Sequence, residues 1–273
     1  MSNLAVRDGE EKPERTSTVC LLAHPDDEVA LAFGILKSRR ERHRVHCLYL
    51  TDGTARGARP NRRAHESRRV LARLGVLSGD THFIGIENGY RDGSLIDVIE
   101  SSMAAVTRIT DPLEVSEILC LAREGGHPDH DAAHLIALAV ARRKGCEQNV
   151  HGFSLYNGWG LKGPFFRVAR ALPGHSMRPL TGVTLPESIR VASLAFAYPS
   201  QWRTWLGLAP EFVAKCFVGR GLGGYPCRVE EIHCRPHPGP LFYERRFGVT
   251  YETFVQRTSP FVRKWLGRDS ENA

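Results

Sequence analysis

Residues 18–36, TVCLLAHPDDEVALAFGIL, decide the fold of this 273-residue chain. The segment begins with a short apolar run, residues 18–23, whose β-branched content is typical of a buried strand. It ends with residues 29–36, which have the mass and spacing of a packed helix. The polar residues between these two parts therefore lie on a turn that leads from a strand into a helix.

The same arrangement recurs about a hundred residues later. Residues 115–121 predict a second buried strand, residues 131–142 predict a helix, and GGHPDH at 125–130 lies between them. In open α/β sheets, ligands bind in the crevice beyond the carboxyl ends of the strands. We therefore expect the two turns to meet in one crevice.

Further elements follow the same alternation. Apolar runs predict strands at 45–50, 82–86 and 153–156, and a helix at 95–109. Strands that alternate with helices indicate a parallel sheet with helices on both faces. The predicted fold class is α/β, with a Rossmann-like, mostly parallel, doubly wound sheet and a C-terminal extension that shapes the substrate cleft.

The chain divides into three parts by composition. Residues 1–17 predict a disordered leader, residues 18–157 the catalytic core, and residues 158–273 a proline- and glycine-punctuated region that completes the fold and the cleft. An aromatic cluster in the third part could pack against the core or line an acceptor site for a hydrophobic substrate. Its members are Trp202, Trp205, Phe212 and Phe217.

The two turns contain the parts of a metal hydrolase. A cation such as Zn²⁺ accepts imidazole nitrogen and carboxylate oxygen, and a catalytic site uses three protein ligands. His24, Asp27 and His130 could be those three. Asp26 would then be available to accept a proton from water, and His127 to stabilise charge on a substrate oxygen. Each motif alone could also be a helix start or a turn, but two such motifs after two strands favour the functional interpretation.

On these motifs the chain resembles the PIG-L/LmbE family of zinc-dependent de-N-acetylases. Residues 23–28 match the family's first motif at every position, and residues 127–130 match its second. Weaker matches lie at 51–53, 63–66 and 92–95, so that the resemblance covers about residues 18–156. Gly125 stands where some members that act on thiol-cofactor precursors carry a tyrosine.

The resemblance implies roles for eight residues. The ligands of one zinc ion, or of another divalent transition metal, would be His24, Asp27 and His130. The other five would be Asp26 as general base, His127 as acid or oxyanion stabiliser, Asp129 as the carboxylate that aligns the imidazole of His127, and Arg63 and Asp92 as contacts to the sugar.

The reaction that this resemblance implies is removal of the acetyl group from an N-acetylglucosamine-type amino sugar on a larger aglycone, giving acetate and a free amine. One alternative is hydrolysis of another amide in natural-product or nucleotide-sugar metabolism. An alternative of another class is a non-catalytic carbohydrate-binding protein with the same fold. The last is disfavoured because every proposed ligand, base and acid is present in the sequence.

The formal charge of +7 reflects in part an arginine-rich stretch, residues 56–73. These arginines form either a solvated face or a contact to an anionic aglycone. Nucleic acid is not expected as a partner, because no aromatic platform is interleaved with the charges.

No apolar run reaches the roughly 18 to 20 residues of a membrane span. Seven cysteines without framework spacing, and a leader without a signal-peptide core, predict reduced thiols and a cytoplasmic protein.

Three further histidines were weighed as metal ligands. His134 follows His130 by four residues on the same helix, a spacing that zinc sites use, and is a second choice as ligand. His233 and His237 flank a cysteine, but the neighbouring prolines indicate a strand end or a turn. We interpret that stretch as structural, with His237 at the rim of the cleft.

Overall fold

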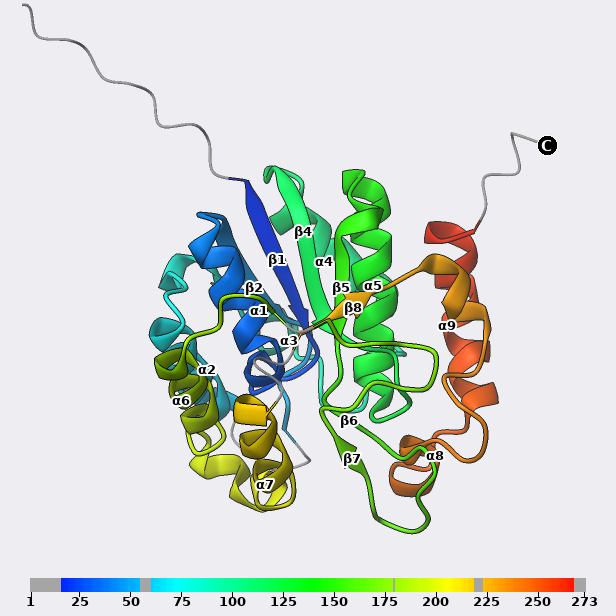
Figure 1. Ribbon diagram of the computed structural model, residues 1–273. Helices are drawn as coiled ribbons and strands as arrows, with labels where there is room; N and C mark the ends of the chain where they lie inside the picture. Colours follow the sequence, from blue (N-terminus) through cyan, green and yellow to red (C-terminus); the bar gives the residue numbers. More distant parts are fainter. Residues whose placement is uncertain (1–15, 55–59, 179, 219–222, 268–273) are drawn as a thin grey trace, which may run out of the picture.

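A six-stranded sheet with the order β3-β2-β1-β4-β5-β8 forms the centre of the molecule in a computed structural model, which describes residues 16–54, 60–178, 180–218 and 223–267 (Figure 1). Its strands are β1 (Ser17–Leu22), β2 (Arg44–Tyr49), β3 (Thr81–His82), β4 (Val115–Leu121), β5 (Val150–Phe153) and β8 (Tyr225–Pro226). Strands β1 to β5 are parallel, and β8 pairs antiparallel with β5. This sheet confirms the predicted α/β, Rossmann-like fold.

Helices cover both faces of the sheet (Figure 1). One face carries α1 (Glu28–Arg40), α2 (Pro60–Arg73), α6 (Leu185–Leu194) and α7 (Trp202–Val218). The other carries α4 (Ile99–Thr110), α5 (Pro128–Lys144) and α9 (Tyr251–Trp265). The chain also forms two short helices, α3 (Ile84–Asn88) and α8 (Phe242–Arg246). A separate antiparallel pair consists of β6 (Tyr156–Asn157) and β7 (Arg167–Val168).

The apolar run at the start of the chain's first motif builds both hydrophobic cores. Successive residues of a strand point to opposite faces of the sheet. Cys20 and Leu22 therefore pack in the core beneath α1, whereas Val19 and Leu21 pack in the core beneath α5. Because every residue of β1 is buried, the strand shows a continuous apolar pattern instead of an alternating one.

Helix α5 begins within the second motif. His127 caps its N-terminus and accepts a hydrogen bond from the backbone N–H of Asp129, and Pro128 occupies the first turn, where no N–H is needed. The helix ends at Gly145, which has the left-handed conformation, with φ 69°. The cap at His127 fixes where the helix starts and therefore where His130 lies, on its first turn.

Two predicted strands and one predicted helix start are wrong. In place of a strand at 82–86, only Thr81–His82 pairs with β2, and the chain then turns into α3, where Gly85 packs so closely on the backbone of Thr51 that a Cβ would overlap it. In place of a strand at 153–156, β5 ends at Phe153. In place of residue 95, α4 begins at Ile99, because backbone N–H groups of the preceding turn bond to a carboxylate of the second motif.

The predicted leader lies outside the described residues except for its last two, of which Ser17 is already the first residue of β1. The region after residue 157 contributes α6 and α7 to one helical layer, β8 to the sheet and α9 to the other layer. No helix among the described residues is long and apolar enough to cross a membrane.

Candidate functional site

Three side chains from the two motifs meet beyond the carboxyl ends of β1 and β4. His24 Nδ1 lies 3.2 Å from His130 Nε2, which lies 3.3 Å from Asp27 Oδ1, and His24 Nδ1 is 3.6 Å from the other Asp27 oxygen. All three side chains are buried. Donors about 2.0 to 2.1 Å from a tetrahedral zinc ion stand about 3.3 Å apart. The donor types and their spacing therefore fit a zinc ion.

The second nitrogen of His24 faces two carboxylates. Nε2 lies 3.2 Å from Asp129 Oδ2 and 3.2 Å from Asp92 Oδ1. A proton on Nε2 satisfies these oxygens and leaves the lone pair of Nδ1 directed at His130, which is the tautomer that a metal requires. The Asp129 carboxylate is itself held by the backbone N–H groups of Gly93, at 2.6 Å, and Leu95, at 3.0 Å.

Asp129 was expected to align His127, and here the structure differs. The carboxylate contacts His24, while the contact to His127 comes from the backbone N–H of Asp129, which donates to Nδ1 at 3.1 Å. The proton of a neutral His127 is therefore on Nε2, which lies 3.4 Å from Asp92 Oδ1. Burial lowers the pKa of His127. Asp92 thus lies between two imidazoles. Burial raises the pKa of Asp92, but the neighbouring His24 and His127 outweigh this effect and hold that pKa well below its usual range.

Asp26 adopts a strained backbone conformation. Its φ of 124° is one that non-glycine residues rarely adopt, and such strain clusters at functional sites. Its backbone N–H donates to Glu28 Oε2 at 3.0 Å, and its carboxylate pairs with Arg63 Nη2 at 2.5 Å. Burial raises the pKa of Asp26 to about 6, and the Arg63 guanidinium opposes that rise. The side chain is 13% exposed, so solvent can still reach it.

Arg63 was expected to touch the sugar, but the structure places it behind Asp26. The residue is 7% exposed, and besides Asp26 its guanidinium donates to the backbone oxygens of Pro25, at 2.9 Å, and Gly53. It therefore braces the first-motif turn. The other described arginines of α2 are exposed, namely Arg62, Arg68, Arg69 and Arg73, while Arg56 and Arg59 lie outside the described residues.

Aromatic side chains that the motifs did not indicate form one wall of the site. The ring centroid of Phe247 is 4.4 Å from that of His127, and the Tyr156 centroid is 5.6 Å from that of His130. Phe166 packs against Tyr156 in a tilted arrangement and Phe242 edge-to-face, with centroid distances of 5.8 and 5.7 Å. Only Tyr156 had a sequence signal, since it ended a predicted strand; the others come from the region without recognisable motifs.

Glu124 connects this wall to the second motif. One of its oxygens accepts hydrogen bonds from the backbone N–H groups of Leu155 and Tyr156, both at 2.8 Å, and the other accepts one from Asn157 Nδ2 at 3.0 Å. Burial raises the pKa of Glu124 to about 7, against the effect of these donors.

At Gly125, φ is +70° and a Cβ would overlap Leu241, so no tyrosine fits there without rearrangement.

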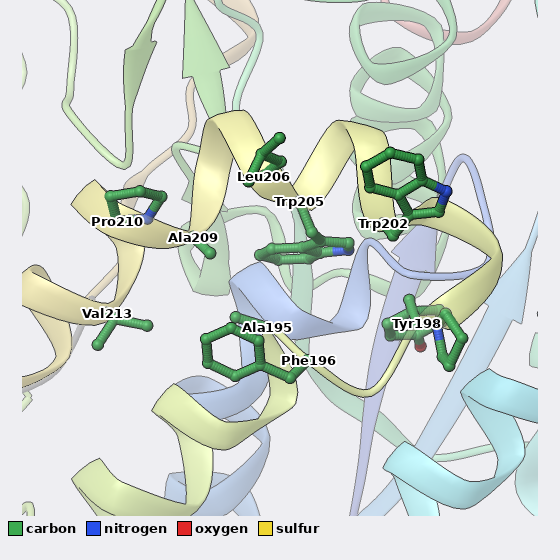
Figure 2. A pocket seen from close by; sticks show the side chains of 10 residues that line it. Ala195, Phe196, Tyr198, Trp202, Trp205, Leu206, Ala209, Pro210 and Val213 are labelled. Atoms are coloured by element: carbon green, nitrogen blue, oxygen red, sulfur yellow. The ribbon is translucent and has the colours of Figure 1, made fainter.

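The tryptophan cluster on α7 is partly core and partly surface. Trp205 and Phe212 are buried, whereas Trp202 is 59% exposed and Phe217 is 45% exposed. Figure 2 shows Trp202 and Trp205 lining an apolar groove with Phe196 and Tyr198 from the segment after α6, and its volume is about 490 Å³. None of the eight predicted site residues lines this groove. Trp205 and Phe212 therefore pack in the core, as one of the two predicted alternatives states, whereas Trp202 and Phe217 do not.

The three further histidines lie apart from the cluster of His24, Asp27 and His130. His134 Nδ1 is 3.1 Å from the backbone oxygen of Leu121 and 3.7 Å from Cys120 Sγ. His237 is buried, with Nδ1 2.9 Å from the backbone oxygen of Pro238. His233 ends a short 3₁₀ helix, Val229–His233.

Comparison with known proteins gives a family match and a fold match. Residues 19–141 match the family model described as PIG-L: GlcNAc-PI de-N-acetylase. The structure is similar to that of the A40926 pseudoaglycone deacetylase Dbv21, with a TM-score of 0.53 and 17% identity over 78% of this chain and 96% of that one. It is also similar to the zinc-inhibited form of the teicoplanin deacetylase Orf2, with a TM-score of 0.55 and 18% identity over 77% and 96%. No curated protein matches the sequence.

Proposed function

We propose that this chain is a PIG-L/LmbE-type de-N-acetylase, an amidohydrolase, and that it deacetylates an N-acetylglucosamine-type sugar on a larger aglycone. The observation that supports this most directly is the convergence of the two motifs. A triad of potential metal donors, a strained carboxylate and an imidazole with a lowered pKa lie together beyond the carboxyl ends of β1 and β4. These are the groups that hydrolysis of an amide needs.

In this proposal His24, Asp27 and His130 hold one zinc ion, with Asp129 fixing the tautomer of His24. A zinc ion bound there would supply Lewis acidity, which polarises a carbonyl oxygen and lowers the pKa of water. Asp92 shares the His24 Nε2 proton and also accepts from His127, so it couples the metal side of the site to the proton-donor side. Its expected contact to the sugar remains part of the proposal, because its side chain is 28% exposed.

Asp26 and His127 have different roles in this proposal. Asp26 accepts the proton of the water that adds to the acetamide carbon, and passes it to the amine nitrogen as the C–N bond breaks, while Arg63 holds its carboxylate in position. His127 keeps its Nε2 proton and donates a hydrogen bond from it to the developing oxyanion. Acetate and a free amine result.

The aromatic wall supports a sugar substrate. Phe247 and Tyr156 lie against the two histidines of the second motif and offer apolar faces for a pyranose ring. Phe247 is 44% exposed and can be reached from solvent. Since Phe166, Phe242 and Phe247 all follow residue 157, we propose that residues 158–273 complete the substrate cleft.

The experiment is release of acetate from a panel of N-acetylated substrates, with and without a chelator. The panel includes simple N-acetylglucosaminides, nucleotide-linked N-acetyl sugars and glycopeptide pseudoaglycones of the kind named for the structural relatives. We expect activity on an N-acetylglucosaminide with a bulky aglycone, lost on chelation and restored by zinc. Activity only on amides that lack a sugar would overturn the substrate assignment.

Two variants of adjacent carboxylates test the assigned roles. Asp27→Asn should lose the metal and the activity together, because a neutral amide replaces an anionic ligand. Asp26→Asn should keep the metal and lose about 10²-fold or more in kcat. Metal content by elemental analysis distinguishes the two, and the opposite pattern would reverse the roles.

A further inference from the structure

A second group of potential metal ligands lies one turn further along α5 than His130. Cys120 near the end of β4, His134 on α5 and Cys227 directly after β8 place one ligand atom each within 4.8 Å of one another. Their exposed fractions are 0%, 4% and 4%. Three elements far apart in the sequence thus bring two thiols and an imidazole together inside the protein.

The donor set suits a soft or borderline cation. Thiolates and imidazole are the ligands of Zn²⁺ in sites of the Cys₂His type, whereas Mg²⁺ and Ca²⁺ take oxygen ligands. Donor atoms in such a tetrahedral site stand about 3.6 to 3.8 Å apart. Because the present atoms already lie within 4.8 Å, movements of about 1 Å would bring them to that spacing.

A direct contact joins His134 to Cys120. His134 Nδ1 lies 3.7 Å from Cys120 Sγ and 3.1 Å from the backbone oxygen of Leu121. Nδ1 is therefore the ring nitrogen that faces the thiol, and binding of a metal by Nδ1 would place the ring proton on Nε2.

A cavity lies beside His134, one member of the cluster. His134 lines a cavity of about 300 Å³ whose other walls include Arg123, His175 and Glu231. The cavity can hold the water that would occupy a fourth coordination position. We propose that Cys120, His134 and Cys227 bind a second metal ion, of the Zn²⁺ class, with its fourth position open to this cavity.

Another cysteine pair of the same chain shows what an ordinary buried pair looks like. Cys20 and Cys47 lie opposite each other on β1 and β2 and are fully buried, but they form no metal-ligand group with a third side chain among the described residues. Of these two cysteine pairs, Cys120 and Cys227 have an imidazole beside them, and that imidazole lines a cavity. Cys47 therefore provides the matched control.

Binding at this second site would support the first. His134 follows His130 by one turn of α5, a rise of about 6 Å. A metal shared by Cys120, His134 and Cys227 would tie that turn to β4 and to the segment after β8. In this proposal the second ion takes no part in hydrolysis at the first site.

Cobalt substitution tests this proposal on the full-length protein. Thiolate ligands give Co²⁺ an intense charge-transfer band in the near ultraviolet, which the nitrogen and oxygen donors of the first site cannot give. We expect two equivalents of metal and this band in the wild type. Cys120→Ser and Cys227→Ser should each lose one equivalent and the band, whereas Cys47→Ser should keep both, with circular dichroism confirming that every variant is folded.

The outcomes separate this site from the deacetylase site. Asp27→Asn should lose the first metal and the activity yet keep the charge-transfer band, so failure of one assignment leaves the other measurable. One equivalent of metal and no band in folded wild-type protein would overturn the second site. A Cys120–Cys227 disulfide in protein purified under reducing conditions, detected by intact mass and thiol titration, would overturn it as well.

Discussion

Replacing Arg63 with alanine removes the brace behind the strained Asp26. The guanidinium donates to the Asp26 carboxylate and to two backbone oxygens of the surrounding turns, and it is 7% exposed. Loss of one partner from a buried charge pair costs about 3 to 5 kcal/mol, because the other charge is left without compensation. Asp26 remains 13% exposed, so water can compensate in part and we expect about 3 kcal/mol of lost unfolding free energy.

The same change should lower turnover more than substrate affinity. Arg63 contacts the proposed base and not the crevice, so Arg63→Ala should reduce kcat by about 10²-fold, the lower end of what a general base contributes, and leave KM within a few-fold. Arg63→Lys should be intermediate, because an ammonium keeps the charge but not the forked geometry.

Urea denaturation and steady-state acetate release measure the two effects. Arg73→Ala is the matched control, since Arg73 is an exposed arginine on the same helix and its loss should change the unfolding free energy by no more than about 0.5 kcal/mol. Equal effects of Arg63→Ala and Arg73→Ala would refute the reasoning. A rise in KM alone would show instead that Arg63 touches the substrate.

Three further outcomes follow from single contacts. The pKa of Glu124 is raised from 4.5 to about 7 in the folded protein, so between these pH values the folded state binds more protons than the unfolded state. The free energy of unfolding should therefore fall by on the order of 2 kcal/mol as pH rises from about 4.5 to 7. Glu124→Gln should lack this component, and a difference between variant and wild type that is constant from pH 5 to 8 would contradict it. Gly85→Ala should destabilise by about 2 kcal/mol or more in urea denaturation, because a Cβ would overlap the backbone of Thr51, whereas Gly79→Ala, with open space around it, should be nearly neutral. Phe247→Ala should raise KM for the sugar substrate with little change in stability, and an unchanged KM would remove Phe247 from the sugar-binding wall.

The sequence by itself was sufficient for the class of fold and for the grouping of His24, Asp27 and His130, the proposed metal ligands. Strand β1, strand β4 and helix α5 were predicted close to their observed bounds, because their signals are local: continuous apolar runs and a helix cap within a few residues. Parallel strands place their carboxyl ends at one edge of the sheet, so the meeting of His24 with His130, 106 positions apart, followed from fold class alone.

Tertiary structure decided the partners of the buried side chains. Arg63 braces Asp26, Asp129 holds His24 instead of His127, and residues 84–88 form a helix where a strand was predicted. Cys120, His134 and Cys227 were separate features of the sequence, and only the packing of β4, α5 and β8 groups them. The physical reason is that the spacing of a motif determines only which turn a residue occupies. The hydrogen-bond partners of its side chain come from the other elements that pack against that turn, and these are set by the tertiary structure.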